Sequence, residues 1–520
     1  MKTIHRFIFS LLALSGMLIT ACTDKNGATA EKSKDVTIKG IVAYCPSEDR
    51  EIDELTASLN TATSLITLTT TPVYSNETPV DLSNVIIQIT LAKGATSDLK
   101  STYNLADGNI GKLIITAEDG VTTAEWTIKA VRADNLVVIP KSVKATATSV
   151  WSRSASDLGV KSPLWGSRAM DCYREGGNDY LYILDNELPH GDNNRIRIHD
   201  AKTGDFIDDI KEYEGGSFGC RSYMWALKCD EAGHIAISRL NADGAGFWLD
   251  LYDNAGNGWA YLGTPLKYPQ NQEGLTYYAG KKVNIVGDLV NGQGMVIATC
   301  GHFYGSLAIY AEYNTFMFSD GIPAASIVQN SYPASAPTEW WAGEVQQESL
   351  SNPTIYVTIV DEYNYGGDTP EEEWPTLHAS TFEIYDPVAG TTVAVDESCF
   401  NYRILASEVF NCGSGKYLYT LEQSYSPKAP YVERLYYISD TELLKTVTAD
   451  SEDFDKFLLW ESEPDDIGGA VTNVDNRFGS VCVLPDATGT SAVLFCYHAN
   501  TDSEKAKVCA TRVTFEETFE

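Results

Sequence analysis

The sequence predicts an all-β protein in which a small β-sandwich precedes a β-propeller of about six blades. The first observation is a unit of strands and a turn that recurs with a period of about 60 residues, as propeller blades do. The second is composition, because the 520 residues include 40 glycines and 29 tyrosines, which suit turns and strands. The third is that no long segment after the first ~20 residues follows a helical period. A chain of this length is expected to form two or three domains.

The clearest copy of the repeated unit runs from Tyr180 to Ile210. Its segment Tyr180–Leu184 is apolar on both faces, as a strand buried on both sides must be, and Arg195–Asp200 alternates before a turn that reaches Gly204. The alternating strand and its turn return further along the chain at Leu249–Asp253, Phe382–Asp386 and, in a weaker form without the aspartate, Leu307–Ala311.

Six apolar segments are predicted as the inner strands of the blades, each followed by a more alternating outer strand. These segments are Tyr180–Leu184, His234–Ser238, Met295–Thr299, Thr354–Val360, Tyr417–Leu421 and Ala492–Tyr497. Six blades is the predicted number and seven remains open, over a propeller of residues 135–520. Because the chain ends shortly after an outer strand, a strand from about Val143 to Ser154 is expected to complete the last blade and remove its exposed edge.

Residues 1–21 have the pattern of a secretory signal, with Lys2 and Arg6 before an apolar stretch that is too short for a lasting membrane span. The segment Leu18–Cys22 resembles the lipobox of bacterial lipoproteins. That resemblance implies cleavage before Cys22 and acyl chains on its sulfur, which would anchor the protein to a membrane without a transmembrane helix. The alternative is an ordinary signal followed by an unrelated cysteine. Residues 22–35 are small and polar, and they are expected to form a flexible tether.

Residues 36–133 are predicted to form the β-sandwich, with turns at Asp107-Gly108 and Asp119-Gly120. Its apolar runs are Ile38–Val42, Leu65–Thr69, Val85–Leu91, Leu113–Thr116 and Trp126–Val131. The closing part, from Ile115 to Val131, resembles the last hairpin of the Ig-like or cadherin-like modules carried by many surface lipoproteins of Bacteroidetes. The resemblance implies an Ig-like spacer on a lipid-anchored protein of the outer membrane, located at the cell surface or in the periplasm.

The charge of the protein excludes some partners. The formal net charge is −33, and loss of Lys2 and Arg6 with the signal leaves 36 basic against 71 acidic residues, or −35. This balance argues against binding to nucleic acid and against electrostatic docking on anionic lipid. High solubility is one explanation. Calcium binding is another, although no acidic cluster has EF-hand spacing, so no cofactor is assigned.

Eleven cysteines would suggest disulfides in an exported protein. Several of them, including Cys229, Cys482, Cys496 and Cys509, lie in or beside apolar strands, where free cysteine behaves as a small buried residue. No CxxC pair occurs, so a structural zinc site is not expected and no metal ligands are assigned. The sequence also contains no HExxH motif, and no catalytic residue is assigned.

Aromatic residues in two long connections are the candidate ligand-binding residues: Trp340, Trp341, Tyr363, Tyr365 and Trp374. Exposed aromatic rings stack on sugar rings and also suit protein interfaces. The alternative is that these rings fold back and plug the propeller. They can form one platform only if both connections emerge on the same face.

The resemblance to Bacteroidetes surface lipoproteins implies glycan capture and uptake. The leading hypothesis is therefore a non-catalytic binding protein that captures glycan at the bacterial surface. One alternative is an adhesin that binds a surface protein. Another is a carbohydrate-active hydrolase or lyase that uses a carboxylate or His302 near the central channel.

Overall fold

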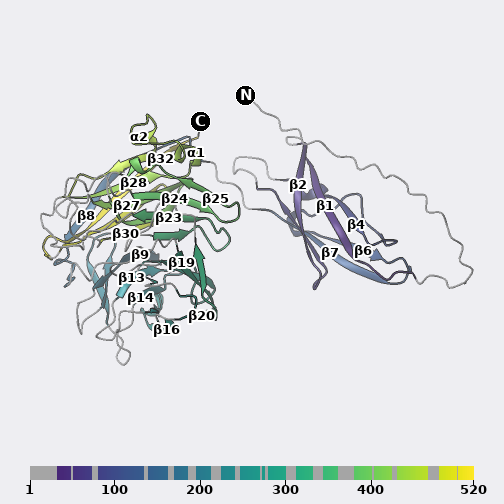
Figure 1. The fold of residues 1–520 in the computed structure, drawn as a ribbon, viewed down its shortest axis with the longest axis horizontal. Coiled ribbons are helices and arrows are strands. Elements are labelled where there is room, and N and C mark those ends of the chain that lie inside the picture. Colours follow the sequence, from purple (N-terminus) through teal and green to yellow (C-terminus); the bar gives the residue numbers. More distant parts are fainter. Residues whose placement is uncertain are drawn as a thin grey trace, which may run out of the picture. The chain divides into compact units, whose positions relative to one another are not determined.

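The computed structural model describes most of the chain, in two compact units that divide between Val138 and Ile139. The described residues are 32–47, 51–72, 80–133, 139–161, 169–185, 195–211, 224–239, 246–269, 272–275, 279–280, 282–299, 312–331, 344–360, 380–400, 403–423, 430–465, 479–500 and 502–519. Both units are built almost entirely from strands (Figure 1). Within the described residues, no helix is long and apolar enough to cross a membrane.

The N-terminal unit is one hydrogen-bonded network of seven strands in the order β4-β1-β2-β3-β7-β6-β5, in which β3 and β7 are parallel. The strands are β1 (Ile38–Ser47), β2 (Glu51–Asn60), β3 (Leu65–Thr70), β4 (Ile86–Leu91), β5 (Thr96–Ser97), β6 (Ile110–Thr116) and β7 (Thr123–Val131), with 3₁₀ turns at Leu82–Asn84 and Ala106–Gly108. Each predicted apolar run lies in or overlaps one of these strands, whereas β2 was not predicted. Gly108 and Gly120 have φ of 78° and 74°, which explains why glycine ends both predicted turns.

The second unit is a six-bladed β-propeller. Blade 1 contains β9 (Met170–Glu175), β10 (Asn178–Asp185), β11 (Arg195–Asp200) and β12 (Phe206–Lys211). Blade 2 contains β13 (Met224–Cys229), β14 (Ile235–Arg239), β15 (Phe247–Tyr252) and β16 (Tyr261–Tyr268). Blade 3 contains β17 (Val283–Gly287), β18 (Gln293–Thr299), β19 (Glu312–Ser319), β20 (Ile322–Pro323) and β21 (Val328–Ser331), the last two both pairing with β19.

The remaining three blades follow the same plan. Blade 4 contains β22 (Glu344–Gln347), β23 (Ile355–Val360), β24 (Ser380–Asp386) and β25 (Thr391–Ala394). Blade 5 contains β26 (Arg403–Cys412), β27 (Gly415–Gln423), β28 (Tyr431–Tyr437) and β29 (Leu458–Glu461), with the short helices α1 (Thr441–Leu444) and α2 (Phe454–Phe457) between the last two strands. Blade 6 contains β30 (Gly479–Pro485), β31 (Ser491–His498), β32 (Lys507–Thr518) and β8 (Ser142–Ser154). Further 3₁₀ turns lie at Ala255–Asn257 and Glu397–Cys399.

The predicted inner strands are the second strands of their blades, which corrects the sequence analysis. The innermost strands are β9, β13, β17, β22, β26 and β30, which contact one another in a closed ring. Second strands such as β10 and β27 have neighbours on both edges and both faces, so their sequences are almost continuously apolar. The innermost strands carry charged residues such as Lys228 and Glu408, and those residues hid them from a search for apolar runs.

The predicted closing strand is confirmed. Strand β8 pairs with β32 in antiparallel register from Ser154, opposite Lys507, to Ser142, opposite Thr518. In Figure 1 the blue β8 therefore belongs to a blade otherwise made from the yellow-green C-terminal end of the chain. Buried residues of blades 1 and 6, including Leu181 and Phe495, share one core, so this closure joins the two ends of the propeller.

Candidate functional site

Antiparallel pairing divides the links between the propeller strands over two faces. Links from the first to the second strand and from the third to the fourth strand of a blade lie on one face, here called the turn face. Links from the second to the third strand and from one blade to the next lie on the opposite face, here called the connection face. Turn-face links include very short ones, since only two residues separate β9 from β10 and β26 from β27.

Both aromatic-containing connections start and end on the connection face. One of them, residues 332–343, links blade 3 to β22, and the other, residues 361–379, links the second strand β23 to the third strand β24. The end of the first connection lies beside the start of the second, because Glu344 pairs with Thr358, and the second connection starts and ends on paired strands, because Val360 pairs with Ser380. The condition of a common face is therefore met by the strands that anchor the two connections. The five candidate ligand-binding residues lie outside the described residues: Trp340, Trp341, Tyr363, Tyr365 and Trp374. Cys22 and His302 also lie outside them.

The chain enters the propeller on the turn face. Strand β8 begins there at Ser142, opposite Thr518 at the end of β32. The amide of Lys141 also donates a hydrogen bond of 2.7 Å to the carbonyl oxygen of Thr518. The first strand of the propeller in sequence order therefore begins on the face opposite to the one where strands anchor the aromatic-containing connections.

A charged pair crosses the axis of the ring. Lys228 lies on β13 of blade 2 and Glu408 on β26 of blade 5, and these blades are opposite one another in a ring of six. The Nζ of Lys228 lies 2.5 Å from Oε2 of Glu408 and 3.7 Å from Oδ1 of Asp171, which is on β9. The amide of Cys229 donates to the second oxygen of Asp171 at 2.6 Å. Three of the six innermost strands thus meet at one ammonium group.

Further polar side chains tie neighbouring innermost strands together. Lys282 Nζ lies 2.7 Å from Oε1 of Glu344, whose Oε2 accepts hydrogen bonds from the amide and hydroxyl of Ser407 at 3.0 and 2.9 Å. The amide of Met170 donates to the hydroxyl of Ser480 at 3.0 Å and so joins blade 1 to blade 6. These residues were not predicted from the sequence. A charged side chain within an otherwise apolar segment, as at Lys228, is the feature of the sequence that could have identified them.

The environment of the axis shifts the pKa values of Glu408 and Lys228. Burial raises the pKa of Glu408 to about 7, and Asp171 adds to the increase although Lys228 opposes it. Burial alone would lower the pKa of Lys228, but the charges of Asp171 and Glu408 outweigh it and raise this pKa well above 10.5. The side chain of Glu408 remains 21% exposed. A carboxyl group that titrates near neutral pH is suited to proton transfer.

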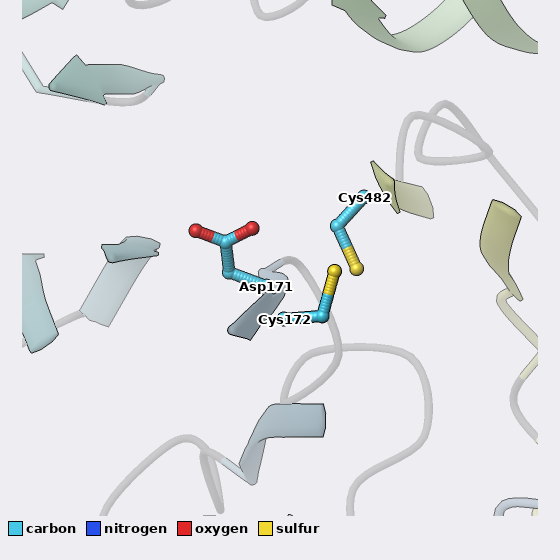
Figure 2. Close-up of side chains that lie close together, drawn as sticks. All are labelled: Asp171, Cys172 and Cys482. Carbon is cyan, nitrogen blue, oxygen red and sulfur yellow. The ribbon is translucent and has the colours of Figure 1, made fainter. Parts of the chain in front are cut away.

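Three clusters of His, Cys, Asp or Glu in the described residues bring their ligand atoms within 4.8 Å of one another. The first consists of Asp171, Cys172 and Cys482. Figure 2 shows the two sulfur atoms side by side and the carboxylate of Asp171 to one side of them. Burial raises the pKa of both thiols, and the ammonium group of Lys228 lies 3.7 Å from Asp171. The ammonium group of Lys228 and the amide of Cys229 engage both oxygens of Asp171, so this cluster offers no free carboxylate ligand.

The second cluster contains Asp230, His234 and Asp288 on the turn face. Asp230 is fully engaged, because its Oδ1 accepts from the amides of Ala232 and His234 and its Oδ2 accepts from the amide of Leu289 and from His234 Nδ1, all at 2.8 to 3.0 Å. The other ring nitrogen of His234 lies 3.3 Å from the amide nitrogen of Asn291. These bonds fasten a turn of blade 2 to a turn of blade 3 and leave no open ligand position.

The third cluster contains Glu433, His498 and Cys509, on strands of blades 5 and 6. His498 Nδ1 lies 2.5 Å from Oδ2 of Asp465, and its Nε2 lies 3.3 Å from Oε1 of Glu433. This Nε2 is buried and forms no hydrogen bond with any described residue. The third cluster therefore differs from the second because one ring nitrogen of its histidine, Nε2 of His498, remains available as a metal ligand.

No family model matches the sequence, and no curated protein matches it. Solved structures with similar folds include a DUF4623 family protein from Bacteroides eggerthii, which is 14% identical, covers 94% of this chain and 100% of its own, and has a TM-score of 0.46. A protein of unknown function from Dyadobacter fermentans is 11% identical over 71% of this chain and 99% of its own, with a TM-score of 0.44. An α-L-arabinanase from Penicillium chrysogenum is 9% identical over 72% and 98%, with a TM-score of 0.39. These similarities are too low to transfer an activity.

Proposed function

We propose that this protein is a lipid-anchored binding protein of the bacterial cell envelope, whose propeller captures glycan on its connection face without catalysis. One observation carries the proposal. The strands β21, β22, β23 and β24 anchor both aromatic-containing connections on the same face, and the end of the first connection lies beside the start of the second. Two connections that meet on one face can present their rings to one ligand.

The residue types in these connections suit a sugar. Trp340, Trp341 and Trp374 offer flat apolar faces, and each ring that stacks on a sugar contributes on the order of 1 kcal/mol. The acidic run Glu371–Glu373 lies in the same connection as Trp374 and supplies acceptors for sugar hydroxyl groups. A net charge of −33 makes an acidic polymer a poor ligand, so a neutral glycan is the preferred class.

The order of the segments along the chain agrees with a connection face that is open to ligand. Lipidation at Cys22 would anchor the protein, residues 22–35 would act as a tether, and residues 36–133 would act as an Ig-like spacer. Strand β8 begins on the turn face, opposite to the face on which strands anchor the aromatic-containing connections. This arrangement supports capture at the outer membrane, on the cell surface or in the periplasm.

A glycan array tests the ligand class. Replacing Trp340, Trp341 and Trp374 together by Ala should weaken binding by roughly ten-fold or more and leave the melting temperature nearly unchanged. The matched control is Phe206→Ala, because Phe206 is an exposed ring on the turn face and its loss should leave binding intact. A large fall in melting temperature of the triple variant would show that the rings are buried plugs. Loss of binding to a protein partner, without any glycan signal, would favour the adhesin instead.

Membrane fractionation tests the anchor separately. Cys22→Ser should move the protein from the membrane fraction to the soluble fraction, because acyl chains on Cys22 are the proposed attachment. A matched control is Cys45→Ser, which removes a buried thiol from the N-terminal unit and should leave the protein in the membrane fraction. A Cys22→Ser protein that stays membrane-bound after a carbonate wash would contradict lipid anchoring and leave the binding proposal intact.

One observation favours an enzyme as a second candidate. Glu408 titrates near neutral pH at the axis, with Asp171 and Glu344 as further carboxyl groups. A hydrolase would use one such group as acid and another as base. Sugar hydrolysis that disappears in Glu408→Gln, in a variant that still binds glycan, would support this candidate over a binding protein.

A further inference from the structure

The cluster of Glu433, His498 and Cys509 lies where three strands meet at the connection face. Glu433 is close to the start of β28, His498 ends β31, and Cys509 is close to the start of β32. In the strand order of a blade these three positions share one face. Asp465 joins them because it pairs through its backbone with Tyr431. Residues distant in the sequence are thus held together by regular backbone pairing.

The hydrogen bonds of His498 orient its free nitrogen toward Glu433. The imidazole is 2% exposed and stacks on the ring of Tyr431, with centroids 5.0 Å apart. The Asp465 carboxylate, 2.5 Å from Nδ1, accepts the Nδ1 proton. Nε2 lies 3.3 Å from a carboxylate oxygen of Glu433 and forms no hydrogen bond of regular geometry in the described part of the chain. Burial lowers the pKa of His498, but Asp465 and Glu433 outweigh it and raise the pKa, so the position between Nε2 and Glu433 favours a positive charge, either a proton on Nε2 or a metal ion in its place.

We propose that Glu433, His498 and Cys509 bind one divalent metal ion of the zinc class through Oε1, Nε2 and Sγ. Carboxylate, imidazole and thiolate are the donor types that zinc uses in proteins, and three protein ligands leave a fourth position for water or a ligand. Two ligands each ~2.0 Å from a tetrahedral ion lie about 3.3 Å apart. This matches the 3.3 Å between Nε2 and Oε1.

The surrounding groups support this ligand set. A carboxylate on the second nitrogen of a ligating histidine fixes the ring and strengthens the ligand, and Asp465 occupies that position. The hydroxyl of Tyr419 donates to the other oxygen of Glu433 at 2.5 Å, which leaves Oε1 for the metal. The hydroxyl of Ser152 lies 3.5 Å from Sγ of Cys509 and can donate to a thiolate.

The charges of the site balance a divalent ion. Glu433 and a Cys509 thiolate together carry two negative charges, and the charge of Asp465 is paired with Lys507, whose Nζ is 2.8 Å away. Without a metal, burial and the charge of Glu433 raise the pKa of Cys509 to about 12, so the thiol holds its proton. Binding therefore releases that proton to the solvent as the metal-sulfur bond forms. The inference does not depend on the proposed glycan binding.

Titration with cobalt(II), a spectroscopic substitute for zinc, tests the site on the full-length chain in detergent. The expected result is one ion per chain with thiolate-to-cobalt charge-transfer absorption, displaced by zinc. Cys509→Ser should abolish the charge-transfer band, and His498→Gln should weaken binding at least ten-fold. The matched controls Cys399→Ser and His234→Gln change a buried cysteine and a buried histidine elsewhere in the propeller and should leave the spectrum unchanged.

Two results would overturn the proposal: cobalt binding without a thiolate band, and a thiolate band that survives in folded Cys509→Ser. If Cys509→Ser does not fold, X-ray absorption of the zinc-loaded natural chain decides the question without a variant. It should show one sulfur neighbour at ~2.3 Å together with nitrogen and oxygen neighbours at ~2.0 Å. A shell of oxygen and nitrogen alone would show that the ion binds elsewhere.

Discussion

Two buried histidines of the propeller have similar neighbours and different hydrogen bonding. His234, on the turn face, lies among Asp230, Asp253 and Asp288, and His498, on the connection face, lies among Glu433 and Asp465. Both ring nitrogens of His234 have hydrogen-bond partners, whereas only Nδ1 of His498 does within the described residues. Residue type alone does not distinguish a histidine cluster that stabilises the fold from one that binds a ligand. The number of satisfied polar atoms does.

The position of each cluster in the propeller agrees with this distinction. The His234 cluster joins two turns that follow innermost strands, and backbone amides occupy the oxygens of Asp230. The His498 cluster is formed by side chains of regular strands whose backbone groups are already paired with one another, as Cys509 is with Cys496. Its side chains therefore need other partners. The predictions that follow test this difference, from the largest expected effect to the smallest.

Asp230→Ala should destabilise the propeller most. The substitution leaves the buried amides of Ala232, His234 and Leu289 without their acceptor, at a cost of about 3 kcal/mol. Urea unfolding measures the loss. The matched variant is Asp288→Ala, which removes a more exposed carboxylate that lies 3.4 Å from His234 and accepts from the amides of Val290 and Asn291, and its cost should be smaller, about 1 kcal/mol. Equal losses in the two variants would show that the hydrogen bonds of Asp230 do not stabilise the propeller more than those of Asp288.

Asp465→Asn should weaken zinc binding about 10- to 100-fold, because it removes the carboxylate that orients the imidazole of His498. Asp253→Asn is the matched change beside the other histidine, 3.6 Å from His234 Nε2, and should leave zinc affinity unchanged. Competition with a chelator of known affinity measures both constants. If the two variants bind zinc equally well, Asp465 has no role in positioning His498.

The pKa of both histidines is raised in the metal-free protein, so the pH response that separates the two clusters is that of zinc binding. Burial lowers the pKa of His234, but its hydrogen bond to Asp230 and the charges of Asp288 and Asp253 outweigh burial and raise the pKa above 6.5. A histidine whose pKa is raised on folding stabilises the folded state fully below 6.5, and that stabilisation is lost as the pH rises through the folded value. Zinc affinity should instead rise with pH, because its ligands must lose protons.

Unfolding free energies from about pH 6 to pH 8 separate these effects. In the metal-free protein, the advantage of the natural chain over His234→Gln should shrink as the pH rises. Zinc should stabilise the natural chain more at the higher pH and should do so equally in His234→Gln. A constant difference between the two metal-free proteins would mean that His234 does not titrate differently on folding.

Sequence patterns predicted the architecture because strands buried on both faces are visible as apolar runs. The closing strand β8 was predicted on a different ground, namely that the last outer strand needs a partner to complete its blade. The innermost strands were misassigned because side chains such as Lys228 and Glu408 pair across the axis. Such pairs are invisible until the ring is closed, since their partners lie in blades on opposite sides.

Much less of the candidate site was predictable. Cys509 was interpreted as a buried apolar residue, which its strand alone supports, and His498 ends an apolar strand. Their relation to Glu433 depends on strand pairing within blade 6 and on packing against blade 5. No spacing motif records such a relation. Sequence analysis did identify the aromatic-containing connections, and strand direction then supplied the common face that the sequence left open.

The smallest expected effect comes from Lys507→Gln. The ammonium group of Lys507 lies 2.8 Å from the Asp465 carboxylate, and this side chain is 29% exposed, so the pair contributes less than about 1 kcal/mol to stability. Removing this positive charge strengthens Asp465 as an acceptor for His498 and reduces repulsion of a bound cation. Zinc affinity should therefore rise several-fold, in the direction opposite to Asp465→Asn. Lys445→Gln, an exposed lysine paired with Glu442, is the matched control and should leave affinity unchanged. Weaker zinc binding in Lys507→Gln would mean that Lys507 supports the ligands and does not repel the ion.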